Sequence, residues 1–339
     1  MALPIFLIIL LFSCGITPTQ AEETDQFTLP PNALQDIGPI VSGELYEVLN
    51  TLINRTNSEI QDLIPRAQQS KYAASQLALR LNGSYLVDLF YAKTSPGFPH
   101  WLRWTWSRLR KQKGVSFNEV RPWKRIYWLV FSQNPLFQLL APTINMYGYS
   151  FGTDKLNHFF MQGHSYYAMY NYYLGQGKST TQAYQAMIRY GQVTEQSYLG
   201  VLATGIYSNG DLSANYAGWK FYRNFVHNVK IGKRTLSPLL VLNGYQWEFA
   251  RRVRSDTLLK PYLSDNLNEA LNPSHFVFMR KQIHRSVKKR CDDWIARQDL
   301  TQQWVKEKLK ETSLWHGANY GHWLPARGAV TLEVCFEEK

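Results

Sequence analysis

The chain has 339 residues and carries 37 Lys and Arg against 25 Asp and Glu, which gives a formal net charge of +12. This length allows one large domain or two ordinary ones, each with a sizeable core. An apolar share of 45% with only 18% charged residues excludes an intrinsically disordered chain. No apolar run reaches the roughly 18–20 residues of a bilayer-spanning helix, so the sequence predicts no such span.

The first 21 residues have the pattern of a secretory signal peptide. An apolar run of 11 residues, Leu3 to Ser13, is followed by small residues at Thr19 and Ala21, before Glu22. We expect cleavage after Ala21, and hence export to the periplasm or outer envelope. The alternative is a lipobox ending at Cys14, which would then be lipidated.

Removal of residues 1–21 leaves two cysteines, Cys291 and Cys335. An even pair in an exported chain predicts one disulfide that closes the C-terminal region. The alternative is two buried thiols. Two cysteines without histidines at zinc-finger spacing predict no structural zinc site.

Residues 22–150 are expected to form an N-terminal helical region. Residues 22–39 are polar and proline-containing, which predicts an extended leader, and apolar residues then recur at helical spacing over 41–82, enough for two or three helices. Residues 101–125 hold four Trp and eight basic residues against one acid. The apolar stretch 126–144 is broken by prolines and predicts a buried segment.

Residues 151–226 are expected to form a three-helix core, with helices over 153–175, 180–203 and 211–225. Residues 227–339 predict short helices, a basic helix over about 275–297 and a strand-like tail over 329–336. There is no regular alternation of strands and helices. The predicted fold class is therefore mainly α, a multi-helix globular domain with a short irregular or β tail.

Polar residues in the predicted core are spaced to share helix faces. Asp154 and His158 are four residues apart, as are Asp211 and Asn215, and Glu195 lies on the helix between them. We expect Asp154, His158, Glu195 and Asp211 to form a candidate site for zinc, manganese or iron. Glu195 or His158 would then act as the catalytic proton-transfer group.

A structural interpretation of the same residues stands beside this one. Asp154 lies where an acid favours a helix N-terminus, and Ser208 precedes Asp211 at the spacing of a capping box. His158 would then be a core histidine that is hydrogen-bonded to an acid.

The same residues carry a resemblance to a known family. They are Asp154, Lys155, His158 and Phe159, then Glu195, then Ser208, Asp211, Leu212 and Gly218. Over about 75 residues this pattern resembles an uncharacterised bacterial exported family typified by YfiM, predicted periplasmic lipoproteins, and the D-K-x-x-H element recurs in VanZ-like membrane proteins. The resemblance implies an envelope location and a helical core, but no reaction. Thr194 and Asn215 depart from it, because the family has Lys and Asp there.

A second candidate site is the G-x-S-x-G pattern around Ser150. Ser150 would be a hydrolase nucleophile if a strand preceded it and a helix followed it directly. No parallel strand–helix series supports the α/β-hydrolase sheet that such an elbow needs. The alternative is a glycine-rich turn before a helix.

Basic residues interleaved with tryptophans over 101–125 are typical of a helix that lies on an anionic membrane. The alternative is a tryptophan-rich core with a solvated basic face. A second basic cluster comprises Arg280, Lys281, Arg285, Lys288, Lys289 and Arg290. For an exported chain these predict phospholipid or lipopolysaccharide phosphates as partners, and no nucleic acid. The function hypotheses are a metal-dependent hydrolase of an envelope lipid or phosphoester, a non-catalytic membrane-associated binding or assembly protein, and a serine hydrolase through Ser150.

Overall fold

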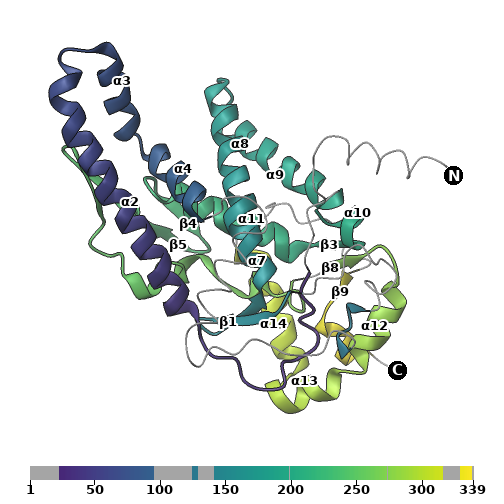
Figure 1. Cartoon of the computed structure of the whole chain (residues 1–339). Helices are drawn as coiled ribbons and strands as arrows, with labels where there is room; N and C mark the ends of the chain where they lie inside the picture. Colours follow the sequence, from purple (N-terminus) through teal and green to yellow (C-terminus); the bar gives the residue numbers. More distant parts are fainter. Residues whose placement is uncertain are drawn as a thin grey trace.

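Helices make up most of the computed structural model, as the sequence predicts (Figure 1). The structure describes residues 23–94, 124–128, 141–197, 199–272, 274–315 and 329–337. The predicted signal peptide with Cys14, most of the Trp-rich basic segment 101–125, and most of the stretch 126–144 lie outside these residues. Within them, no helix combines the length and apolar character needed to cross a membrane.

Three N-terminal helices follow the leader, over Gly38–Ala67 (α2), Lys71–Arg80 (α3) and Gly83–Thr94 (α4). Helix α2 starts with a proline in its first turn, where a missing N–H costs nothing. Ser70 caps α3, because its side chain accepts a hydrogen bond from the N–H of Ala73. The predicted helical region is confirmed and extends to residue 94.

The central helices surround the predicted polar site. Their bounds are Thr153–Asn157 (α7), a π-helical turn His158–Gln162 (η2), Gly163–Gly175 (α8), Thr180–Gln196 (α9), Val201–Thr204 (α10) and Asn209–Arg223 (α11). Helix α9 ends before the expected residue 203, because Ser197 has non-helical dihedral angles. A Cβ on Gly163 would lie 2.6 Å from the Cα of Gly218, so two glycines allow α8 and α11 to touch through their backbones.

The strands are short and antiparallel. Two-stranded ribbons pair Thr143–Met146 (β1) with Tyr149–Gly152 (β2), Val229–Ile231 (β4) with Arg234–Leu236 (β5), and Leu240–Asn243 (β6) with Gln246–Phe249 (β7). A three-stranded sheet has the order Ile206–Ser208 (β3), Ser274–Phe276 (β8) and Ala329–Val330 (β9). This sheet brings the middle of the chain and its C-terminal region together.

The C-terminal region contains three helices, over Arg280–Lys288 (α12), Cys291–Gln298 (α13) and Gln302–Trp315 (α14). Short 3₁₀ turns occupy Ser255–Thr257 (η3), Lys260–Tyr262 (η4), Asp265–Leu267 (η5) and Leu332–Phe336 (η6). The prediction of a single basic helix over about 275–297 is therefore wrong. Residues 274–276 form β8, Met279 takes a left-handed backbone conformation, and α12 and α13 are separate helices.

The predicted disulfide is present between Cys291 and Cys335. It ties the start of α13 to η6 across a sequence separation of 44 residues. The tail differs from the expected strand, because only Ala329–Val330 pairs with β8 and the rest forms η6.

Two hydrophobic cores meet at the polar site. One includes Leu156 and Phe159 together with α2, α8 and α11 residues, and the other includes Ala270 and Phe276 with the C-terminal helices. Leu156 follows Lys155 in the chain, and Ala270 follows Glu269. The charged groups described below therefore lie at the junction of the two cores.

Candidate functional site

The pair Asp154 and His158 faces the pair Asp211 and Asn215, and His158 makes the contacts between them. Its Nδ1 lies 3.0 Å from the Asn215 side-chain oxygen, and its Nε2 lies 3.4 Å from Asp211 Oδ2. One ring nitrogen of His158 therefore faces an amide and the other faces a carboxyl group. The side chain of His158 keeps 13% exposure, whereas Asp211 is buried. His158 therefore links the buried acid to solvent.

The centre of the site is Lys155, which the sequence reasoning did not select as a site residue. Its ammonium is fully buried and lies 2.7 Å from Asp154, 2.5 Å from Asp211 and 2.5 Å from Glu269. Burial alone would lower the pKa of Lys155, but the surrounding carboxylates outweigh it and raise the pKa well above its ordinary value. Lys155 is therefore a permanent buried cation.

Asp154 is shared between Lys155 and the N-terminal leader. Its Oδ2 accepts a hydrogen bond from the Lys155 ammonium at 2.7 Å, and its Oδ1 accepts one from Thr24 Oγ1 at 2.7 Å. Gly152 leaves room for this contact, since a Cβ there would lie 1.9 Å from Thr24 Oγ1. Both oxygens of Asp154 are thus already engaged by the protein.

Glu195 lies on α9, as expected, and because α9 ends at Gln196 it stands in the last turn of that helix. Its Oε1 accepts a hydrogen bond from the N–H of Ser208 at 2.9 Å, whereas its buried Oε2 has no hydrogen-bond partner among the described residues. Burial, and then the negative charge of Asp211, raise the pKa of Glu195 well above its usual range. Glu195 thus binds its proton more tightly than an exposed glutamate does.

Two further carboxylates, Glu23 and Glu269, join the site from outside the predicted motifs. Glu269 accepts hydrogen bonds from Ser208 Oγ and Ser274 Oγ, at the ends of β3 and β8. Glu23 Oε1 accepts one from Thr204 Oγ1 at 3.0 Å, and its buried Oε2 has no hydrogen-bond partner within the described chain. Burial, followed by the charges of Asp211 and Glu269, raises the pKa of Glu23 well above its ordinary value.

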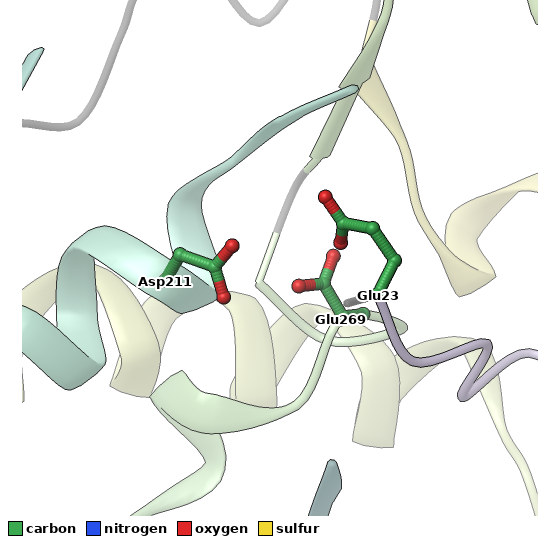
Figure 2. A group of neighbouring side chains, drawn as sticks. All are labelled: Glu23, Asp211 and Glu269. Carbon is green, nitrogen blue, oxygen red and sulfur yellow. The ribbon is translucent and has the colours of Figure 1, made fainter. Parts of the chain in front are cut away.

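Glu23, Asp211 and Glu269 form a cluster that could hold a metal ion. Each offers one carboxylate oxygen, and these oxygens lie within 4.8 Å of one another (Figure 2). The three residues come from the leader, the first turn of α11 and the segment before β8. An oxygen-only set suits hard cations such as Mg²⁺ or Mn²⁺ better than it suits zinc.

The site carries more negative charge than its own cation can balance. Five buried carboxyl groups surround one ammonium, so full ionisation with a neutral His158 would leave 5 − 1 = 4 uncompensated negative charges. Buried charges without partners are costly. Protons on the carboxyl groups, a bound cation, or both must therefore reduce this charge, and two protons or one divalent ion alone would leave 4 − 2 = 2 negative charges. The buried Oε2 of Glu23, which has no hydrogen-bond partner within the described chain, is consistent with a bound cation.

Ser150 lies away from the geometry of a nucleophile elbow. It is in β2, paired with Asn145 in an antiparallel ribbon, and the tight turn is formed by Tyr147 and Gly148 before that strand. An elbow needs the serine in the turn that joins a strand to a helix. The main-chain oxygen of Ser150 instead accepts hydrogen bonds from Gln26 and Asn268, which tie the leader to the segment that carries Glu269.

The sequence predicts Asp154, His158, Glu195 and Asp211 as site residues, but it does not predict Lys155, Glu23 or Glu269. Lys155 lies inside the D-K-x-x-H element, and a lysine that directly follows an acid in the first turn of a helix is the available signal. No local pattern marks Glu23 or Glu269. Comparisons with protein-family models, with curated proteins and with solved structures find no match to this chain.

Proposed function

We propose that the chain is an exported bacterial envelope protein that acts as a metal-dependent hydrolase on an envelope lipid or another phosphoester. The observation that carries this proposal is the convergence of Glu23, Asp211 and Glu269 beside the ammonium of Lys155. A network that only neutralised one lysine would not need five buried carboxyl groups, because each further charge costs folding free energy.

The proposed roles follow from the contacts. Glu23, Asp211 and Glu269 would hold the ion, and Mn²⁺ or Mg²⁺ suits them. When bound, such an ion supplies a Lewis acid for a phosphoryl oxygen and lowers the pKa of water. Lys155 orients Asp211 and Glu269 by direct contact, and Asp154 positions Lys155.

The proposed proton carrier is His158. Its Nε2 faces Asp211 at 3.4 Å, and its side chain reaches solvent. It can therefore take a proton from the site and release it to water, which is the role of a general base. Glu195, with its raised pKa, would hold a second proton within the site.

Metal analysis tests the ion. Protein purified without chelator should hold about one equivalent of Mn²⁺ or Mg²⁺, and added Mn²⁺ should raise the melting temperature. Glu23→Gln should abolish both effects, whereas the exposed control Glu248→Gln should leave them unchanged. A wild-type protein that neither retains these ions nor is stabilised by them would overturn the metal proposal.

Activity is tested separately. His158→Ala should lose ion-dependent hydrolysis of a phosphodiester or phospholipid while it keeps the ion, since His158 is outside the three-carboxylate cluster. Export is supported by the signal-peptide pattern and by the disulfide, which is typical of oxidising compartments. Sequencing the N-terminus of the periplasmic protein should give Glu22 first.

A further inference from the structure

Helix α12 exposes a continuous basic face. Its apolar residues Ile283 and Val287 are buried in the C-terminal core, one turn apart. Lys281, Arg285 and Lys289 follow each other at four-residue spacing on the opposite side, and all three are exposed. Residues 277–290 contain six basic residues and no acid.

One acid, Glu337, lies at the edge of this basic face, where its carboxylate pairs with His284 at 2.8 Å. No salt bridge links Lys281, Arg285 or Lys289 to an acidic side chain in the described part of the chain. Lys288, at the edge of the face, donates a hydrogen bond to the main-chain oxygen of Glu337. The face is therefore available to an anionic partner.

An exposed apolar edge lies directly beside the basic face. Val277 and Phe278, between β8 and α12, are 50% and 64% exposed, and Leu202 on α10 is 68% exposed. The N–H of Val277 donates to the carbonyl of Gly205 at 3.0 Å, so the β3–β8 pairing continues and brings the end of α10 to this edge. Figure 1 shows α10, β8 and α12 on the same side of the molecule.

We propose that this surface, formed by Leu202, Val277, Phe278, Lys281, Arg285 and Lys289, docks on a bilayer that contains anionic phospholipid. The apolar side chains of Leu202, Val277 and Phe278 would enter the boundary between headgroups and acyl chains, while the two lysines and the arginine contact lipid phosphates. Charge complementarity favours anionic lipid. The exposed valine, phenylalanine and leucine favour a bilayer over a purely polyanionic partner, which offers no apolar phase.

The surface also has a short route to the carboxylate site. Strand β8 starts at Ser274, which donates to Glu269, and three residues later the chain reaches Val277 at the surface. At about 3.3 Å per residue, the two points are roughly 10 Å apart along the strand. Docking itself does not depend on the proposed hydrolysis.

Vesicle flotation tests the proposal with the full mature chain. We expect it to float with phosphatidylglycerol-containing vesicles and to stay unbound with pure phosphatidylcholine vesicles, and binding should weaken as salt increases. The double variant K281E/R285E should bind the anionic vesicles at least about 30-fold more weakly, since losing two basic charges alone costs that much. The double variant V277S/F278S should bind the same vesicles about tenfold more weakly, because it loses apolar contacts with the bilayer.

The matched control is K71E/Y72S on α3. It also changes one exposed cation and an exposed aromatic side chain, Tyr72, which is 71% exposed, and α3 lies at the opposite end of the molecule (Figure 1). The control should bind as the wild type does, and all variants should keep the wild-type melting temperature because they change exposed positions. The proposal is overturned if the wild type does not bind, if it binds both lipids equally, or if the control loses as much affinity as the two surface variants.

Discussion

Replacement of Lys155 by methionine is the most direct perturbation of the polar site. Methionine keeps most of the volume but removes the ammonium that lies 2.5–2.7 Å from Asp154, Asp211 and Glu269. Removing one partner of a buried ion pair costs about 3–5 kcal/mol, because the remaining charge is left uncompensated. For a chain of this size, that corresponds to a fall in melting temperature of roughly 4–7 °C.

The cost should depend on pH, and its sign can be worked out. The raised pKa of Lys155 means that its stabilising contribution is fully present below about 10.5 and is lost only as pH rises through the folded-state pKa. Between pH 5 and pH 8 the lysine is therefore charged. Because their pKa values are raised, Glu23 and Glu195 hold their protons to higher pH than exposed glutamates do, so the excess negative charge around Lys155 grows as pH rises.

Thermal unfolding of metal-free protein at pH 5 and pH 8 provides the measurement. Lys155→Met should lose more stability at pH 8 than at pH 5, and the exposed control Lys178→Met should match the wild type at both. A Lys155→Met protein as stable as the wild type at pH 8 would refute the reasoning, since it would mean that the carboxyl groups carry no excess charge.

Three further predictions concern separate parts of the chain. Glu195→Gln should stabilise the metal-free protein near neutral pH, by about 1.4 kcal/mol for each unit by which the pKa of Glu195 is raised. A carboxyl group with a raised pKa lowers the folding stability as pH rises from about 4.5 through the folded-state pKa, and glutamine removes this effect. Calorimetry over that pH range provides the measurement. Gly218→Ala should destabilise by at least about 1–3 kcal/mol in urea unfolding, since its Cβ would lie 1.8 Å from the carbonyl oxygen of Phe159. Cys335→Ser should cost about 4 kcal/mol by opening the 44-residue link to Cys291, and unchanged unfolding would contradict it.

The helices could be predicted where local signals coincide. Over 153–175 an apolar pattern follows an acid at the first turn, and the structure has continuous helical backbone there. The basic segment 275–297 could not be assigned, because its first residues pair with β3 and β9, and such pairing depends on strands far away in the sequence. Charge pattern alone does not distinguish a strand edge from a helix start.

The site shows the same division between local and long-range information. His158, Asp211 and Asn215 could be predicted because four-residue spacing fixes a helix face whatever the tertiary fold. Glu23 and Glu269 could not, since they enter through the leader and a segment before β8 that lack a periodic pattern. Their approach depends on the meeting of two cores, which no local window of the sequence contains.

Two substitutions with opposite expected effects on stability would distinguish a structural network from a cation-binding site. If the polar residues were only a structural network, each partner would stabilise the fold, and both Glu195→Gln and Lys155→Met would weaken it. If the cluster holds carboxyl groups in excess for binding a cation, removal of a carboxylate should strengthen the metal-free protein while removal of the ammonium weakens it. The unpaired oxygens of Glu23 and Glu195 support the second outcome, because neither oxygen makes a hydrogen bond within the described chain that a substitution could break.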